Sequence, residues 1–157
     1  MSSDELETDV VVVGAGNAAA CAAVAAHEQG ARVLMLEAAP EDQRGGNSTY
    51  TGGMFRVVYN GVEDVRQLIP DLTDAELANI ELDTYTEEQY FDDMGRLTQY
   101  RCHPDLTEVM IRQSFDTARW MQSKGVRFQL AYGVHGFKHN NRFKFWGGGA
   151  VQIWGGG

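Results

Sequence analysis

The chain has 157 residues and a formal net charge of −9, and this length is enough for one domain with a buried core. The excess of acidic residues and the lack of a basic stripe argue against nucleic-acid binding. No apolar run approaches the roughly 20 residues that cross a bilayer, and the acidic N-terminus lacks the basic segment of a signal peptide. We therefore expect a cytoplasmic protein without a membrane span.

The first predicted elements are a strand, a glycine-rich turn, a helix and a second strand. Four valines, Val10–Val13, favour a strand buried on both faces, as in a parallel sheet. The turn at 14–19 reads GAGNAA, and a helix rich in small residues runs from it to Gly30. The second strand covers about 32–36 and is followed directly by Glu37. This order predicts an α/β fold, Rossmann-like, that starts with a βαβ unit.

The turn has the residue types that a bound dinucleotide requires. Gly14 allows a tight turn, Gly16 lets a pyrophosphate approach the backbone, and Ala19 keeps the helix close to the sheet. The first amides of the helix have no intrahelical partner and favour an anion. Glu37 follows Gly14 at a spacing close to that of the acid that accepts a hydrogen bond from a ribose hydroxyl, which favours FAD or NAD over NADP. An ordinary βαβ unit is the alternative.

A second glycine-rich segment follows the polar loop 38–44. Its two glycine pairs, Gly45-Gly46 and Gly52-Gly53, bracket a short segment that contains an amide and several hydroxyls. Asn47, Ser48 and Thr51 offer donors and acceptors to phosphate or ring atoms. A solvated loop is the alternative, but the position directly after the acid-bearing strand favours a place beside the nucleotide.

Together these motifs resemble the N-terminus of the fumarate reductase/succinate dehydrogenase-like family of FAD-dependent oxidoreductases. The resemblance is carried by the GAGNAA turn, Glu37, the run Arg44-Gly45-Gly46-Asn47-Ser48 and the run Thr51-Gly52-Gly53. Within the family it is closest to the soluble FAD-dependent tricarballylate dehydrogenases. It continues through Trp120-Met121 and Gly125-Val126-Arg127-Phe128, and so covers about residues 9–128.

The resemblance implies a cofactor, a set of residues that hold it, and a reaction. The implied FAD-binding residues are Gly14, Ala15, Gly16, Asn17, Ala18, Glu37, Ala38, Arg44, Gly45, Gly46, Asn47, Ser48, Thr51, Gly52 and Gly53. Membrane-bound relatives have a flavin-linked histidine where this chain has Gly46, so non-covalent FAD is expected. The implied reaction acts on the CH–CH bond of a small carboxylic acid, of the tricarballylate to cis-aconitate type, and a separate electron acceptor is possible.

Three other functions stay open at this point. One is a related flavoprotein with a different substrate, such as a ketosteroid dehydrogenase. The others are a NAD-dependent dehydrogenase, which does not explain the segment from Gly45 to Gly53, and a nucleotide-binding module without catalysis.

The middle of the chain is predicted to be mostly helical. Capping boxes at 73–76 and 86–89 predict helices near 74–80 and 87–100. A further helix is expected from Pro104 to Lys124, before a short strand over 126–130. We expect residues 1–130 to form the N-terminal part of the FAD-binding domain with a helical insertion.

Residues 131–157 are expected to start a substrate-capping domain. Their basic side chains, with the aromatic residues around them, either face a polycarboxylate substrate or belong to a connecting loop; they are His135, Lys138, His139, Arg142 and Lys144. An apolar run that stops on glycines 155–157 predicts an N-terminal fragment of a longer protein, with the catalytic residues beyond it. Neither Cys21 nor Cys102 has metal-like or disulfide-like spacing, so no metal is expected.

Overall fold

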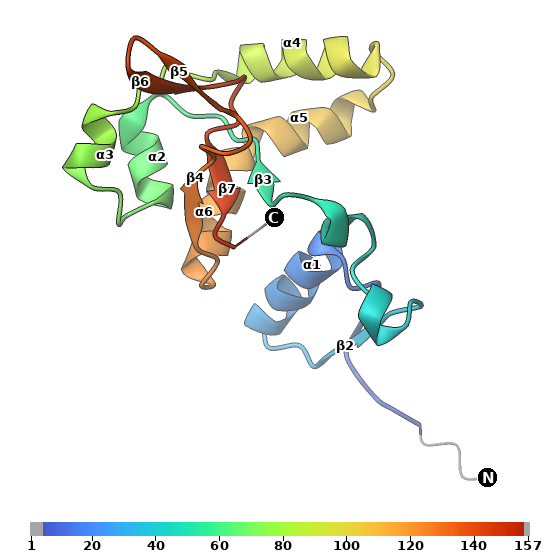
Figure 1. Ribbon diagram of the computed structural model, residues 1–157. Helices are drawn as coiled ribbons and strands as arrows, with labels where there is room; N and C mark the ends of the chain where they lie inside the picture. The colour runs from blue at the N-terminus through green and yellow to red at the C-terminus, as the bar shows by residue number, and fades with distance from the viewer. Residues whose placement is uncertain (1–4, 156–157) are drawn as a thin grey trace. The chain divides into compact units, whose positions relative to one another are not determined.

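The computed structural model describes residues 5–155, which divide into two compact units. The first unit extends to Thr51, and the second begins at Gly52 (Figure 1). The boundary therefore falls at the second glycine pair of the sequence. The predicted division at 130/131 stays a prediction; the structure pairs a strand before that point with a strand after it.

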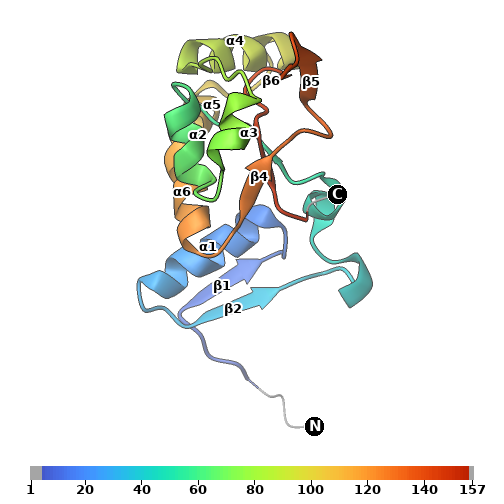
Figure 2. The same ribbon diagram turned by 60° about the vertical axis from the view of Figure 1, so that its left-hand side comes forward.

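The first unit is built on a βαβ arrangement. Strands β1 (Val10–Val13) and β2 (Val33–Leu36) pair in parallel, with Val10 opposite Val33 and Val13 opposite Leu36. Helix α1 (Asn17–Glu28) joins them and lies along the strand pair (Figure 2). After the helix, Gly30 takes the left-handed conformation, with φ +84°. The predicted Rossmann-like start of the fold is confirmed.

The prediction that β1 is buried on both faces is wrong for this structure. Val12 is 9% exposed, whereas Val13 is 83% exposed and Val11 52%. Successive side chains of a strand point to opposite faces, so Val11 and Val13 share the face opposite to that of Val12. The first unit has a single helix to cover its two strands, and one face is therefore left exposed.

Two short 3₁₀ turns complete the first unit. They are η1 (Glu41–Gln43) and η2 (Gly46–Tyr50), and they occupy the segment that the sequence indicates as a loop. Gly45 precedes η2 with φ +98°, a conformation that favours glycine. The glycine pair thus sets the direction in which η2 starts.

The second unit surrounds a small antiparallel sheet. Its strand order is β3 (Met54–Phe55), β7 (Val151–Ile153), β4 (Phe128–Leu130), so the central strand comes last in the sequence. Its helices are α2 (Val62–Leu68), α3 (Asp74–Ala78), α4 (Glu87–Thr98), α5 (Pro104–Arg112) and α6 (Ser114–Ser123) (Figure 1). Side chains from both the sheet and the helices form the buried core, with Val57, Val65, Leu68, Ile80, Ile111, Phe128 and Val151 almost inaccessible.

The two capping boxes form as predicted. The Thr73 hydroxyl accepts a hydrogen bond from the Glu76 amide at the start of α3, and Thr86 does the same for Gln89 at the start of α4. The helix expected over 104–124 is instead two helices, because the chain bends at Gln113 between α5 and α6.

A hairpin of β5 (Gly136–His139) and β6 (Arg142–Phe145) carries most of the basic residues near the end of the chain. Its turn residues Asn140 and Asn141 have φ of 48° and 63°, as a tight hairpin turn requires. The hairpin binds the segment after α3, where Phe143 exchanges backbone hydrogen bonds with Asn79 and Glu81.

Candidate functional site

The glycine-rich turn leads from β1 into α1 and is hydrogen-bonded to the end of β2. The Gly14 amide donates a hydrogen bond of 2.6 Å to the Leu36 carbonyl, and Gly14 has φ +113°. A side chain at position 14 would be strained by this backbone, and its Cβ would lie 3.8 Å from that of Ala19. The turn therefore holds the start of α1 close to the strand pair.

Glu37 lies beside this turn. Its carboxylate accepts hydrogen bonds from the Ala15 amide at 2.8 Å and from the Ala39 amide at 2.9 Å. The amide of Ala39, helped by those of Ala15 and neighbouring residues, lowers the pKa of the Glu37 carboxyl below its usual range. Glu37 is therefore ionised at neutral pH, and its two oxygens keep lone pairs for a further donor such as a ribose hydroxyl.

The second glycine-rich segment packs against the same turn. The Asn17 amide donates a hydrogen bond of 2.9 Å to Ser48 Oγ. A Cβ built at Gly16 would lie 3.2 Å from the Gly45 carbonyl oxygen, which is tighter than an ordinary contact. Residues about 30 positions apart in the sequence are thus brought into one small structure at the N-terminus of α1.

Most of the predicted cofactor residues belong to the first unit. Those within it are Gly14, Ala15, Gly16, Asn17, Ala18, Glu37, Ala38, Arg44, Gly45, Gly46, Asn47, Ser48 and Thr51. The Thr51 hydroxyl donates to the Ser48 carbonyl at 3.2 Å, and Arg44 forms an exposed ion pair with Glu41. The roles of these residues toward FAD stay predictions.

Gly52 and Gly53 belong to the second unit, where their carbonyls accept hydrogen bonds from residues of β7. The Gly52 carbonyl accepts a hydrogen bond from the Gln152 side chain, and that of Gly53 accepts one from the Ile153 amide. This glycine pair therefore also has a structural role beside β7, which the sequence pattern does not indicate.

One supporting residue was not predicted. The Thr49 hydroxyl donates a hydrogen bond of 2.7 Å to the Arg44 carbonyl, and it would be only 2.6 Å from a Cβ at Gly45. Thr49 thus holds the backbone of the glycine pair in place. Its position inside the glycine-rich segment is a signal for such a role, although the contact itself depends on the fold.

These features fit the groups of a dinucleotide such as FAD. The Asn17 amide donates to Ser48 Oγ, and the next amides of the first turn of α1 have no intrahelical partner, as a pyrophosphate site requires. The ionised carboxylate of Glu37 lies beside the turn, and its chemistry matches that of an acceptor for a ribose hydroxyl.

The basic cluster of the β5–β6 hairpin is bound to acidic and carbonyl groups of its own unit. Lys144 Nζ lies 2.7 Å from Glu81 and 3.5 Å from Asp83, and the Arg142 guanidinium donates to the Ile80 carbonyl. His139 lies 3.8 Å from Glu81. These contacts favour the structural interpretation of the cluster over the interpretation that it faces a polycarboxylate.

Metal-binding clusters and membrane-spanning helices are both absent from residues 5–155. Within this range no group of His, Cys, Asp or Glu side chains is arranged to hold a metal ion. None of the helices in the same range has the length and apolar character needed to cross a membrane.

Comparison with known proteins gives a family match and several distant relatives. The family model described as FAD binding domain matches residues 9–151. Digoxin reductase of Eggerthella lenta is 29% identical over 126 residues, which are 80% of this chain and 20% of that protein. Fumarate reductase (cytochrome) of Shewanella frigidimarina is 28% identical over 118 residues, 75% of this chain and 18% of that protein.

A third relative is vinyl phenol reductase of Lactiplantibacillus plantarum, with 29% identity over 121 residues, 77% of this chain and 21% of that protein. The chain spans about a fifth of the length of these curated relatives. The family match covers nearly all of the chain, including the turn, Glu37 and the second glycine-rich segment. The chain therefore belongs to the FAD binding domain family, and FAD is its cofactor.

Proposed function

We propose that the chain is the FAD-binding portion of an oxidoreductase that acts on the CH–CH bond of a carboxylic acid, of the tricarballylate to cis-aconitate type. The observation that carries this proposal is the packing of the Gly45–Ser48 segment on the GAGNAA turn beside Glu37. A NAD site does not require that second segment, and the family match extends through it.

The residues of the first unit have separate roles in holding the cofactor. The amides at the start of α1 bind the pyrophosphate, and Glu37 accepts a hydrogen bond from the ribose. Gly46 offers no side chain to attach the flavin, so the cofactor is held without a covalent bond. When bound, FAD supplies the capacity to take up or give a hydride.

The names of the relatives support chemistry at a carbon–carbon bond. Two of them are named as reductases of fumarate and of vinyl phenol, and both compounds contain a carbon–carbon double bond. The preference for tricarballylate rests on the resemblance of the glycine-rich motifs alone. The match to digoxin reductase, which is named for a steroid glycoside, favours a steroid substrate as the second candidate.

The test is anaerobic addition of substrate to the full-length, FAD-loaded protein. Each turnover removes a hydride and a proton from adjacent carbons of tricarballylate and reduces one FAD. We expect tricarballylate to bleach the flavin absorbance, with one cis-aconitate formed for each FAD. Bleaching by a 3-ketosteroid but not by tricarballylate would select the second candidate. A flavin that stays oxidised with tricarballylate, succinate and the steroid would contradict both.

A further inference from the structure

The chain enters helix α2 through the dipeptide Asn60-Gly61, the only asparagine–glycine pair in the sequence. Asn60 is exposed to solvent, whereas Val65 and Leu68 of the helix that follows are fully buried in the core of the second unit. Neither residue of the pair belongs to the predicted FAD site. A chemical change at this dipeptide would therefore act on a core helix from the surface, without touching the cofactor residues.

The backbone at position 61 requires glycine. Gly61 has φ +118° and ψ −162°, a region that residues with a side chain do not adopt readily. A Cβ there would meet no atom within 4 Å, so the backbone conformation and not crowding makes the demand. The amide nitrogen of Gly61 is thus not shielded by a side chain of its own residue, and it donates no hydrogen bond to any residue in the range 5–155.

The carboxamide of Asn60 is held at the start of the helix. Asp64 Oδ2 accepts hydrogen bonds from the Asn60 backbone amide at 2.8 Å and from Asn60 Nδ2 at 3.3 Å. The other oxygen of this carboxylate accepts one from Gln67 Nε2 at 3.3 Å. The side-chain carbonyl carbon of Asn60 is therefore kept close to the helix entry, beside the residue whose nitrogen is open.

We propose that Asn60 is a site of spontaneous deamidation in the folded protein, and that its product loosens the start of α2. Asparagine is a thermolabile residue. The Gly61 nitrogen attacks Cγ of Asn60, and the new C–N bond forms as the Cγ–Nδ2 bond breaks. The leaving nitrogen takes the proton of the Gly61 amide and departs as ammonia. Water then opens the succinimide at either carbonyl, which leaves aspartate or isoaspartate at position 60 without any oxidation or reduction.

Two other exposed asparagines lack the features of this site. In Asn47-Ser48 the amide of the second residue donates a hydrogen bond of 3.1 Å to the Gly45 carbonyl, within the 3₁₀ turn η2. In Asn79-Ile80 the amide of the second residue donates one of 3.3 Å to the Leu77 carbonyl, and a β-branched side chain crowds it. Both nitrogens are engaged and carry neighbouring side-chain atoms, so the structure selects Asn60.

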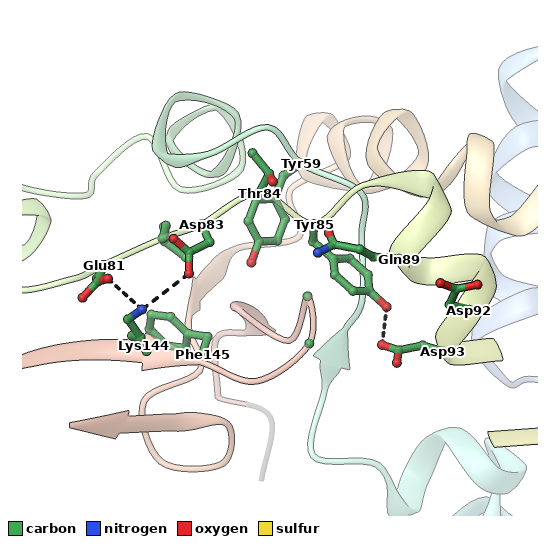
Figure 3. Close-up of a pocket in the computed structure, with 13 residues that line it drawn as sticks. Tyr59, Glu81, Asp83, Thr84, Tyr85, Gln89, Asp92, Asp93, Lys144 and Phe145 are labelled. Carbon is green, nitrogen blue, oxygen red and sulfur yellow. Dashed lines mark hydrogen bonds and ion pairs between the residues drawn. The ribbon is translucent and has the colours of Figure 1, made fainter. Parts of the chain in front are cut away.

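Both products conflict with the contacts around the helix entry. Aspartate at position 60 would replace a hydrogen-bond donor to Asp64 with a second carboxylate, and the two like charges would repel. Isoaspartate would add a methylene group to the main chain directly after Tyr59. The backbone of Tyr59 is fixed to that of Tyr85 by hydrogen bonds of 3.0 and 2.9 Å, and their rings lie beside each other (Figure 3). The added length would therefore displace α2 from this anchored point.

The test is peptide mapping by mass spectrometry after incubation of the purified full-length protein in heavy-oxygen water at mildly alkaline pH. A second sample is incubated in urea. We expect aspartate and isoaspartate with heavy oxygen at position 60 of the folded protein, at a rate within about tenfold of that in urea, because the globally unfolded fraction is too small to account for it. Asn47 and Asn79 should keep their amides in the folded sample.

Two results of this experiment would overturn the proposal. One is a larger deficit of the folded rate against the urea rate, including no conversion at all, because the fold would then protect Asn60. The other is conversion of Asn47 or Asn79 in the folded protein as fast as that of Asn60, because the helix entry would then have no special reactivity.

Variants separate the reaction from its effect on the helix. Asn60→Gln keeps an amide but has a longer side chain that does not close the succinimide ring, so it should abolish conversion at this position. Asn60→Asp carries one of the two products and should lower the urea midpoint of unfolding. Asn141→Asp adds the same charge at an exposed turn and should leave the midpoint nearly unchanged. Equal midpoints for the two aspartate variants would overturn the proposed effect on α2.

Discussion

Gly16 lacks a side chain for two reasons, one from the ligand and one from the protein. A Cβ there would lie 3.2 Å from the Gly45 carbonyl oxygen and 3.4 Å from Ser48 Oγ, and it would also enter the expected place of the pyrophosphate. Glycine at this position therefore permits both the packing of the second segment and the approach of the cofactor.

Gly16→Val should abolish FAD binding in a fluorescence-quenching titration, because the valine side chain would overlap both the Gly45 carbonyl and the expected place of the pyrophosphate. Gly133→Ala is the matched control, since a Cβ there has no atom within 4 Å. Circular dichroism of both variants would confirm that the helices are retained. Stoichiometric FAD in folded Gly16→Val would contradict the assignment of this turn to the pyrophosphate.

Glu37 should make the stability of the protein depend on pH in a predictable direction. Its pKa is lowered in the folded chain, chiefly by the Ala39 amide, so its contribution is present above the unfolded value of about 4.3 and is lost as the pH falls through the folded value. Without added FAD at neutral pH, the midpoint temperature of thermal unfolding should be higher for the wild type than for Glu37→Gln.

This stability difference should shrink as the pH falls below about 4.3, because the protonated carboxyl loses its advantage over the amide. Glu7→Gln, an exposed substitution in the same unit, should show no such trend. A difference between wild type and Glu37→Gln that is constant across this pH range would contradict the hydrogen bonds assigned to the carboxylate.

Among the helices and strands, local sequence patterns correctly predicted the features that depend on residues close together in the chain. The βαβ order and both capping boxes are confirmed because strand propensity, glycine turns and threonine caps act within a few residues. The break between α5 and α6 was not predicted. There the Ser114 hydroxyl accepts a hydrogen bond from the Val58 amide, a contact between distant segments that no local pattern contains.

In the candidate site too, some features follow from local sequence spacing and others depend on contacts between distant segments. Its glycines and Glu37 could be predicted from spacing, because a phosphate-binding turn imposes conformations that few other residues adopt. The hydrogen bond between Asn17 and Ser48, and the support from Thr49, depend on how two segments fold together. The exposure of Val11 and Val13 likewise depends on how many elements cover the sheet, which the valines themselves cannot specify.

The glycine loop after β6 gives a prediction at this scale. Gly148 has φ +71°, and a Cβ there would lie 2.3 Å from the ring of Tyr85. Gly148→Ala should lower the free energy of unfolding by roughly 2 kcal/mol or more, from steric overlap and backbone strain. Urea unfolding against Gly133→Ala would measure this, and a change within about 0.5 kcal/mol of wild type would contradict the packing of the loop.

In the molecule as a whole, the two units contain different structural features. The first contains the turn, Glu37 and the Gly45–Ser48 segment, where we propose that the cofactor binds. The second contains the larger core and a cavity lined by acidic and aromatic side chains.

An absorbance spectrum of the full-length protein, taken before and after acid precipitation, tests whether this chain holds FAD without a covalent bond. We expect flavin bands in the native protein and their complete transfer to the supernatant, because Gly46 has no side chain to bind the flavin. Flavin that stays in the pellet would contradict the non-covalent site. Absence of flavin even after reconstitution with FAD would contradict the FAD site itself.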